Sequence, residues 1–410
     1  MRVVTVEKLE SILGQLGPNP RVVASGNFAA PHTLLAAIDS ALPEFRLNML
    51  NAQPGIPDRP GVSYETAFVG PGMRYHERLT YIPARLSLVP EIFRDHFYPD
   101  VVLLNTSELR HDTVSLGVEV NVLPSAIEAA RDSGGLVIAQ ANKQMPYTYG
   151  DAQIYTDEID YLVEVDEPLA VHNAGAIDEC STAIGDRIAA QVSDGSTLQT
   201  GIGAVPDAVL ASLITRKGLR IWTEMFSDGV LNLFKAGALD ADRPLTASFI
   251  FGSRELYDWV HLNTGIRMMR TEYTNNPGRI GKQAHMTSVN GALQVDLLDQ
   301  ANASRIKGHI YSGFGGQTDF IVGALHSRGG QSFIALPSWH AKADVSTIVP
   351  LLTNPVTSFQ HSAVATENGI ADIFGHSQAE QARNIINFAA HPSVRDDLTK
   401  AAIEMNLFAD

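Results

Sequence analysis

Two stretches of this chain, 175 residues apart, carry the same pattern of residues. Residues 25–38 align without a gap with residues 200–213, so that glycine matches glycine, proline matches proline and the apolar positions after the proline agree. Each stretch follows an amphipathic pattern, at 6–16 and 183–192. Each is therefore predicted to be helix, strand, glycine turn and a helix with an early proline. A chance likeness between two such turns is the alternative, but we favour a duplicated domain.

The rest of the chain fits two similar open α/β domains. The sequence has 410 residues, which suggests two domains of about 200 residues each. Small residues at 173–175 predict the boundary, giving domains 1–174 and 175–410. Both halves alternate strand-like runs with helical patterns, as mostly parallel sheets do. The predicted strands are 21–25, 101–105, 135–139, 196–200, 219–223, 245–251, 332–336 and 362–366. Residues 286–299 alternate around Asn290-Gly291 and are expected to be antiparallel.

Composition disfavours several classes of function. The net charge is −15 without a basic block, so nucleic acid and anionic membrane surfaces are poor partners. A single cysteine, Cys180, fits a reducing compartment, and we expect a cytoplasmic protein because no signal peptide or membrane-length apolar run is seen. Neither His-Glu-x-x-His nor a cysteine pair occurs, so no metal site is expected. A serine hydrolase is disfavoured because Gly-x-Ser-x-Gly is absent.

A glycine loop and a glutamate follow two predicted strands of the second half. In open α/β sheets, ligands bind beyond the carboxyl ends of the strands. Gly201 and Gly203 let a ligand oxygen approach the backbone, and the N–H of Val205 or its neighbour Ala204 is a candidate oxyanion donor. Glu224, 21 positions after Gly203, is a candidate nucleophile toward a thioester.

Two other interpretations of this pair stay open. The loop can be an ordinary tight turn and Glu224 a surface carboxylate near a helix cap. The pair also resembles half of a dinucleotide-binding fingerprint, in which Pro206 replaces the third glycine and Glu224 takes the ribose-binding place. A dehydrogenase therefore competes with acyl-transfer chemistry.

Two further segments are candidate site elements. A second glycine loop at 312–320 contains Gly313, Gly315, Gly316 and Gln317; its N–H groups can donate to an oxyanion or line a ligand channel, while Gln317 and Asp319 can also serve only as helix caps. Residues 366–369 contain Glu367 and Asn368 after a predicted strand, where they form either a second carboxylate site or a polar turn.

These motifs together resemble the acetyl-CoA hydrolase/transferase family of class I CoA-transferases, and within it the 4-hydroxybutyrate CoA-transferases. The resemblance is strongest over residues 194–391 and lies in 194–210, 224–229, 275–277, 313–320 and 366–371. In the first half only 141–146 and 150–151 fit the family pattern. Residues 108–113 stand where the family has a proline-aspartate-glycine stretch.

The resemblance implies ping-pong transfer of CoA through a glutamyl-CoA thioester on Glu224, with coenzyme A as substrate and covalent intermediate. It places Glu224, rather than Glu367, soon after the glycine loop, as the family's nucleophile requires. At the duplication offset Glu224 maps to Met49, which has no carboxylate among its immediate neighbours, so one site per chain is expected, in the second half. A short-chain acyl-CoA and a carboxylate such as acetate, butyrate or 4-hydroxybutyrate are the expected partners, and a homodimer the expected assembly. An acyl-CoA hydrolase, or a protein that binds NAD or a sugar phosphate, remains an alternative.

The same resemblance, with the charge pattern, assigns roles to individual residues. Bulky Trp222, Met225 and Phe226 are expected to narrow the acyl pocket, and Arg305 and Lys307 are further candidate contacts for CoA phosphates. The assigned residues are Glu224, Val205 and Gly316 for catalysis; Gly201, Gly203, Gln199, Gly313, Gly315, Gln317, Arg279 and Lys282 for CoA; and Glu367, Asn368, Asn142 and Met145 for the substrate.

Overall fold

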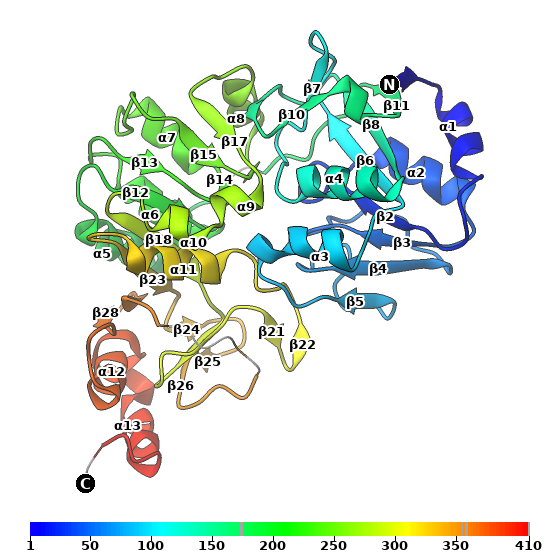
Figure 1. Cartoon of the computed structure of the whole chain (residues 1–410). Helices are drawn as coiled ribbons and strands as arrows, with labels where there is room; N and C mark the ends of the chain where they lie inside the picture. The colour runs from blue at the N-terminus through cyan, green and yellow to red at the C-terminus, as the bar shows by residue number, and fades with distance from the viewer. Residues whose placement is uncertain (173–174, 355, 357–359, 409–410) are drawn as a thin grey trace. The chain divides into compact units, whose positions relative to one another are not determined.

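The chain forms two compact units in a computed structural model that describes residues 1–410 except 173–174, 355, 357–359 and 409–410 (Figure 1). The first unit comprises Met1–Asn173, Pro244–Thr274 and Ile310–Gly315, and the second comprises Ala174–Arg243, Asn275–His309 and Gly316–Asp410. The predicted boundary at 174/175 touches residue 174, which lies outside the described residues. The units differ from the predicted contiguous domains because two later segments pack with the first unit.

Backbone pairing explains why those two segments belong to the first unit. Strand β17 (Ile266–Met268) pairs in parallel with β9 (Tyr149–Gly150) and with β15 (Leu245–Ala247). Gly313 forms an antiparallel bridge with Phe68. Such pairings join residues far apart in sequence, which a reading of local patterns cannot detect.

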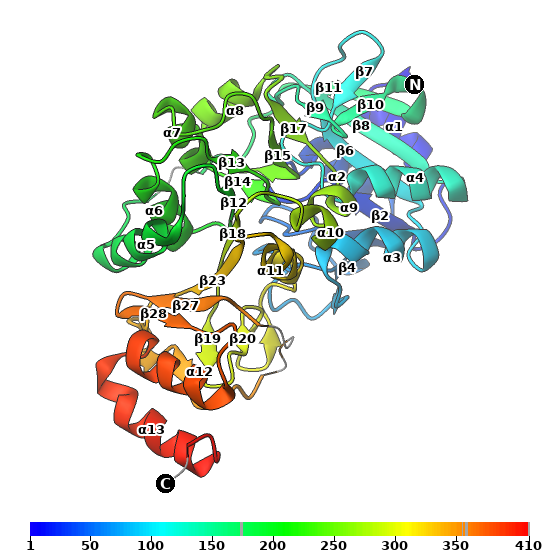
Figure 2. The ribbon, with the colours of Figure 1, turned by 60° about the vertical axis from the view of Figure 1, so that its left-hand side comes forward.

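The first unit is built on an eight-stranded parallel sheet with the order β1-β11-β8-β6-β2-β3-β4-β5. Figure 2 shows α3 and α4 in front of this sheet and α1 and α2 behind it, as right-handed crossovers require when the chain moves both ways from β2. Its inner strands are apolar on both faces because helices cover both. The bounds are β1 Arg2–Val3, β2 Arg21–Ala24, β3 Phe45–Asn48, β4 Val62–Thr66, β5 Leu79–Tyr81, β6 Val101–Thr106, β8 Leu136–Asn142, β11 Tyr161–Val165, α1 Val6–Leu13, α2 His32–Ala41, α3 Val89–Asp95 and α4 Leu123–Ser133.

The second unit is built on a six-stranded sheet with the order β13-β12-β18-β23-β27-β28. All neighbours are parallel except β27 and β28, which are antiparallel. The bounds are β12 Thr197–Thr200, β13 Arg220–Ile221, β14 Met225–Phe226, β18 Met286–Gly291, β23 Gln331–Ala335, β27 Ala363–Thr366, β28 Gly369–Asp372, α5 Glu179–Gln191, α6 Ala204–Ser212, α7 Asp228–Lys235, α10 Pro277–Ile280 and α11 Gln317–His326.

The expectation of an antiparallel segment at 286–299 was wrong for its first half. Strand β18 lies between β12 and β23 and is parallel to both. Its polar residues Thr287, Ser288 and Asn290 are buried, so the alternation does not mark an exposed face. Only β19 (Gln294–Asp296) has an antiparallel neighbour, β20 (Ala301–Asn302), and it also pairs in parallel with β26 (Ile348–Val349).

The duplication is visible as the same order of elements in both units. The first has α1, β2, a glycine turn and α2; the second has α5, β12, a glycine turn and α6. Gly26 is required in the first turn because an added Cβ would lie 2.1 Å from the Leu50 carbonyl oxygen. Gly203 is required in the second because its φ is +118°, which disfavours residues with a Cβ.

The C-terminal part of the second unit is helical. Ser377 and Glu380 form a capping box at the start of α12 (Gln378–Asn384), and α13 (Arg395–Glu404) follows. Apolar side chains of these helices pack with those of β23, β27 and α11 in one core cluster. Among the described residues, no helix combines the length and apolar character that crossing a membrane requires.

Candidate active site

Pairing of β12 with β13 brings the glycine loop and Glu224 to the same edge of the second unit's sheet. The strands are in register at Leu198 and Ile221, and the Trp222 N–H donates to the Leu198 carbonyl at 3.1 Å. One residue later, the Thr223 hydroxyl donates to the Thr200 carbonyl at 3.5 Å. Gly201 and Glu224 directly follow these two threonines, so both begin where the parallel strands end.

Two donors hold the Glu224 carboxylate. The Asn275 Nδ2 group donates to Glu224 Oε2 at 2.8 Å, and the Gly316 N–H donates to the same carboxylate. Asn275 is fully buried, and it lies two residues before α10. An added Cβ at Gly316 would lie 1.9 Å from Glu224 Oε2, so this position admits only glycine while the carboxylate keeps its place. These two donors fix the orientation of the Glu224 carboxylate.

Burial raises the pKa of Glu224 to about 7. The Asn275 hydrogen bond opposes this effect because it favours the charged form, while the negative charge of Asp319 raises the pKa further and the Gly316 N–H lowers it. A carboxylate whose pKa lies near 7 is partly ionised at neutral pH and more basic than an ordinary glutamate. A strongly shifted pKa beside a specific charge is typical of functional carboxylates.

The first glycine loop ends at the amino end of α6. Gly203 is the residue before this helix, and Val205 is its second residue. The N–H groups in the first turn of a helix have no partner within it, so those of Ala204 and Val205 remain available by geometry. Gly201, Gly203 and Ala204 are at least partly exposed, whereas the Val205 side chain is buried. The predicted roles of Gly201, Gly203 and Val205 remain predictions.

The second glycine loop is divided between the two units. An added Cβ at Gly313 would lie 2.4 Å from the Ala67 carbonyl oxygen, and the Leu86 N–H donates to the Gly315 carbonyl at 2.9 Å. Gly315 has a φ of +56°, and an added Cβ there would lie 3.1 Å from Phe68 Cε2, so local packing and backbone geometry within the first unit favour glycine at both positions. Gly316 is the N-cap of α11 in the second unit.

The amide side chains assigned to CoA have protein partners. Gln199 Oε1 accepts from the Ser288 hydroxyl at 2.6 Å and from Asn290 Nδ2 at 3.1 Å, and its Nε2 donates to Asn290 Oδ1 at 3.2 Å. This buried network joins β12 to β18. Gln317 Nε2 donates to the Gly291 carbonyl at 3.2 Å. Contact of Gln199 with CoA therefore needs this network to open, and its assigned role stays a prediction.

Glu367 lies in a separate carboxylate site at the turn between β27 and β28. The Ser338 N–H donates to its Oε2 at 2.8 Å, the Ser338 hydroxyl donates to its Oε1, and Asn368 Nδ2 donates to the Ser338 hydroxyl at 2.9 Å. Burial, followed by the charge of Glu367, raises the pKa of the Cys180 thiol to about 12, so this thiol is protonated at neutral pH. These contacts do not require Glu367 to react, and its assigned role on the substrate side remains a prediction.

The remaining assigned residues have visible local contacts. Asn142 accepts the N–H groups of Gln144 and Glu167 at 3.0 and 3.1 Å, and it is buried within the first unit together with Met145. The expected pocket-narrowing residues are largely core: Met225 and Phe226 are buried, while Trp222 packs against a cluster formed by Ile280, Met286, Phe320 and Ala324.

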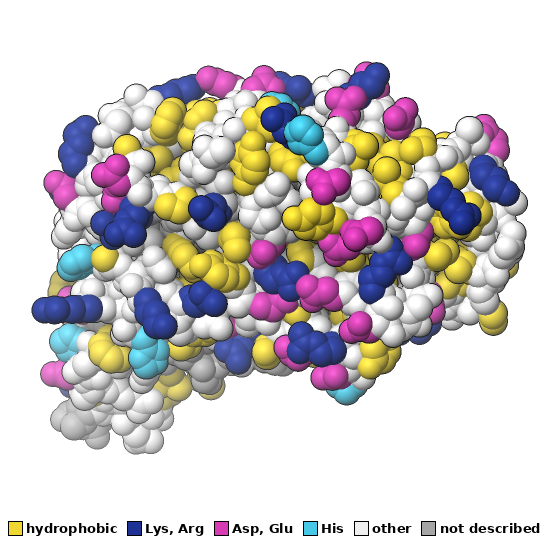
Figure 3. Space-filling model, turned by 45° about the horizontal axis from the view of Figure 1, so that its top comes forward, with side chains coloured by type: hydrophobic (Ala, Val, Ile, Leu, Met, Phe, Trp, Pro, Cys, Tyr) yellow, Lys and Arg dark blue, Asp and Glu magenta, His cyan; other side chains and the backbone are white. Residues whose placement is uncertain are grey.

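Basic side chains assigned to CoA phosphates lie on the surface of the second unit. Arg279 and Lys282 are exposed in and just after α10, Lys307 is exposed, and Arg305 is partly exposed, with its Nη1 donating to the Gly308 carbonyl at 2.9 Å. On the face drawn in Figure 3, Lys and Arg side chains are interspersed with Asp and Glu side chains. The phosphate-binding assignments remain predictions.

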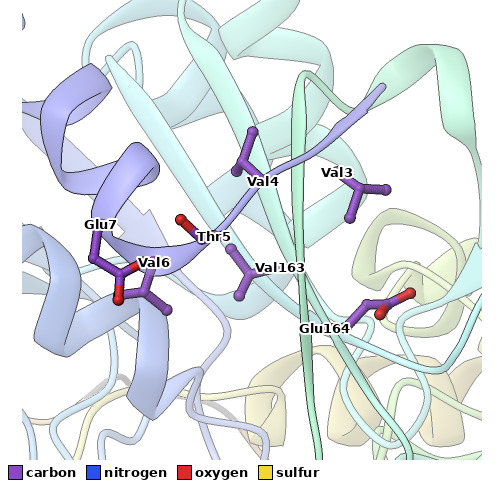
Figure 4. A pocket seen from close by; sticks show the side chains of 7 residues that line it. All are labelled: Val3, Val4, Thr5, Val6, Glu7, Val163 and Glu164. Atoms are coloured by element: carbon purple, nitrogen blue, oxygen red, sulfur yellow. The ribbon is translucent and has the colours of Figure 1, made fainter.

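Two hollows of the first unit contain none of the assigned residues. The larger, about 570 Å³, is lined by residues of the β1–α1 connection and of β11, with Glu7 and Glu164 on opposite sides in Figure 4. The other, about 370 Å³, lies at the loops before β2, β6 and β8. Within the described residues, no three His, Cys, Asp or Glu side chains gather as a metal site would require.

Asn275 is the site residue whose role the sequence reasoning missed. It was noted only as part of a family motif, because no local pattern connects it with Glu224, 51 residues earlier. Asp319 was considered only as a helix cap. Their motifs, 275–277 and 313–320, were the available signals.

Comparisons with known proteins match both halves of the chain. Residues 62–172 match the acetyl-CoA hydrolase/transferase N-terminal domain, and residues 252–402 match the C-terminal domain. The 4-hydroxybutyrate coenzyme A transferase of Clostridium kluyveri is 40% identical over 78% of this chain and 76% of its own. The succinyl-CoA:cyclohexane-1-carboxylate CoA transferase of Geobacter metallireducens is 37% identical over 80% of this chain and 76% of its own.

Solved structures extend the likeness to nearly the whole chain. RipA from Yersinia pestis has a TM-score of 0.92 at 28% identity and covers 99% of this chain and 98% of its own. The 4-hydroxybutyrate CoA-transferase of Porphyromonas gingivalis has a TM-score of 0.83 at 31% identity, with 98% of each chain covered. With its duplicated α/β units and its glutamate beside the glycine loop, this chain belongs to the acetyl-CoA hydrolase/transferase family.

Proposed function

We propose that this enzyme transfers CoA between a short-chain acyl-CoA and a carboxylic acid, with Glu224 as the nucleophile. The observation that carries the proposal is the Glu224 carboxylate held by Asn275 Nδ2 at 2.8 Å and by the Gly316 N–H, with its pKa raised to about 7. Relatives named as CoA transferases support the same chemistry.

The first half-reaction makes an enzyme-bound thioester. A Glu224 oxygen attacks the thioester carbonyl carbon, and the carbon–sulfur bond breaks. The CoA thiolate departs, and the acyl group stays on Glu224 as a mixed anhydride. The thiolate then attacks the glutamyl carbonyl carbon, which releases the original acyl group as a free carboxylate and leaves glutamyl-CoA. A second carboxylate reverses both steps, giving a new acyl-CoA and restoring Glu224. No net proton transfer is needed.

Backbone N–H groups fit the charge that develops during these steps. The Gly316 N–H donates to the free carboxylate, and in our proposal it faces the glutamyl carbonyl oxygen when that carbon is attacked. The N–H of Val205 at the amino end of α6 is proposed to serve the substrate carbonyl. Removing one such donor typically costs about 10²–10³-fold in rate.

We further propose a cytoplasmic homodimer that uses acetate, butyrate or 4-hydroxybutyrate. Relatives named for 4-hydroxybutyrate, butyrate and acetate support these substrates. Exposed Arg279 and Lys282 are proposed to meet the CoA phosphates. Glu367 and Asn368 are proposed to act on the substrate side.

Incubation with acetyl-CoA, with and without butyrate or 4-hydroxybutyrate, tests the proposal. Transfer predicts a new acyl-CoA, detected by mass spectrometry, only when the acceptor is present. Release of free CoA and acetate at the same rate with or without an acceptor would instead show a hydrolase, the activity for which several relatives are named. Glu224→Ala should abolish the product while Glu367→Ala retains it; the reverse pattern would overturn the assignment.

A further inference from the structure

The amino end of α11 brings a second carboxylate near the nucleophile. Gly316, the residue before this helix, contacts Glu224, and Asp319 is the third residue of the helix. Asp319 is fully buried, and α11 packs against β18 and β23. Its neighbour Phe320 lies in a compact apolar cluster. Gly316 at the N-cap and Asp319 at the third helical position share the first turn of α11, so Asp319 lies close to the residue that contacts Glu224.

We propose that Asp319 is a positioning residue whose buried negative charge keeps Glu224 basic enough to displace the CoA thiolate. This inference rests on the proposed function, because it concerns the step in which Glu224 attacks a thioester. Asp319 acts through Glu224 and is not proposed to contact the substrate.

The chemistry explains why such a charge helps. An ordinary glutamate has a pKa of about 4.3 and a free thiol about 8.5. A thiolate is therefore a far stronger base than a carboxylate, and the initial tetrahedral adduct returns to reactants more readily than it expels sulfur. Raising the basicity of Glu224 narrows this gap and favours the forward step.

The two hydrogen-bond donors to Glu224 lower its basicity, and the charge of Asp319 offsets this effect. The hydrogen bonds from Asn275 and Gly316 orient Glu224, but each stabilises its anion and so weakens it as a base. The charge of Asp319 acts in the opposite direction. Orientation and basicity are thereby controlled by different residues.

The groups around Glu224 make Asp319 the charge to test. Within the part of the chain that the structure describes, Asp319 of α11 is the charged group that shifts the pKa of Glu224. The segment before α10 contributes the neutral Asn275, and the chain neighbours Thr223 and Met225 carry no charge.

The pH profile of kcat/KM for acetyl-CoA, with a carboxylate acceptor fixed in excess, tests the inference between pH 5 and 9. In the wild type the rate should rise as Glu224 ionises around pH 7, since kcat/KM reports the free enzyme. Asp319→Asn keeps the shape but removes the charge, so the acidic limb should move to lower pH. With a Brønsted slope of about 0.5, the plateau should fall about threefold for each pH unit of displacement.

Asp296→Asn is the matched control. Asp296 is also fully buried in the second unit, and its carboxylate accepts the backbone N–H groups of Leu298, Gln300 and Leu352. This variant should lose stability and leave the acidic limb in place. If Asp319→Asn does not fold, the smaller neutral Asp319→Ser replaces it.

An unmoved limb in a folded, active Asp319 variant would overturn the inference, as would an equal displacement in Asp296→Asn. These results leave the proposed function standing. Absence of acceptor-dependent turnover in the wild type would instead overturn the proposed function, so the two failures are distinguishable.

Discussion

Replacing Glu224 by glutamine should stabilise the protein at pH 8 and change its stability little at pH 4.5. The pKa of Glu224 is raised from 4.5 to about 7, so the folded state holds a proton that the unfolded chain releases at lower pH. The stabilisation from this proton is fully present below pH 4.5 and is lost as the pH rises through 7. Glutamine carries no charge and avoids this loss.

The displacement sets the size of the effect. At about 1.36 kcal/mol per pH unit, the raised pKa of Glu224 changes the free energy of unfolding by at most about 3 kcal/mol. We expect about 1–3 kcal/mol because Glu224 keeps some contact with solvent. Domains of roughly 150–250 residues gain about 2–4 °C in Tm per kcal/mol. Scanning calorimetry of wild type, Glu224→Gln and the exposed control Glu404→Gln at both pH values measures it. An equal Tm difference at pH 4.5 and pH 8 would refute the reasoning.

Three further predictions concern activity. Gly316→Ala should lower kcat/KM at least about 10²-fold in a folded protein, because the new Cβ displaces the Glu224 carboxylate; Gly17→Ala, where a Cβ meets open space, should be neutral, and comparable losses in both would contradict this. Asn275→Ala removes a bond that lowers the pKa of Glu224, so the acidic limb of the kcat/KM profile should move to higher pH; movement to lower pH would count against it. Borohydride or hydroxylamine treatment after acyl-CoA exposure should mark only Glu224 in peptide mass spectra, and a marked first-unit carboxylate would argue for a second site.

The elements that the sequence predicted well are those whose signals are local. β6 and β8 appear as apolar runs because buried parallel strands are apolar on both faces. The glycine turns could be predicted from the sequence because their backbone geometry and close contacts favour glycine at Gly26 and Gly203. The segment 286–291 gave a wrong prediction because its polar residues are buried, and two of them, Ser288 and Asn290, bond to Gln199, which lies 89 and 91 residues earlier.

The site was predicted only as far as motifs reach. Glu224 and the glycine loop follow adjacent strands, so their position at one edge of the sheet could be inferred from topology. The contact between Asn275 and Glu224 depends on where the chain re-enters the second unit, at residue 275. The hydrophobic periodicity of the sequence does not predict that point. The tight packing that explains Gly313 likewise depends on a distant segment, residues 67–68.

The division of each unit among separate stretches of sequence has a consequence for synthesis. A ribosome that has translated residue 173 has not yet made the last pieces of the first unit, which end at residue 315. At about 5–20 residues per second, the 142 intervening residues take about 7–28 s. Strand β17 ends at residue 268, so β9 is without its partner for the first 95 of these residues. The sheet β15-β17-β9 therefore cannot form until these later strands have been made, and the first unit is complete only after most of the second has been translated.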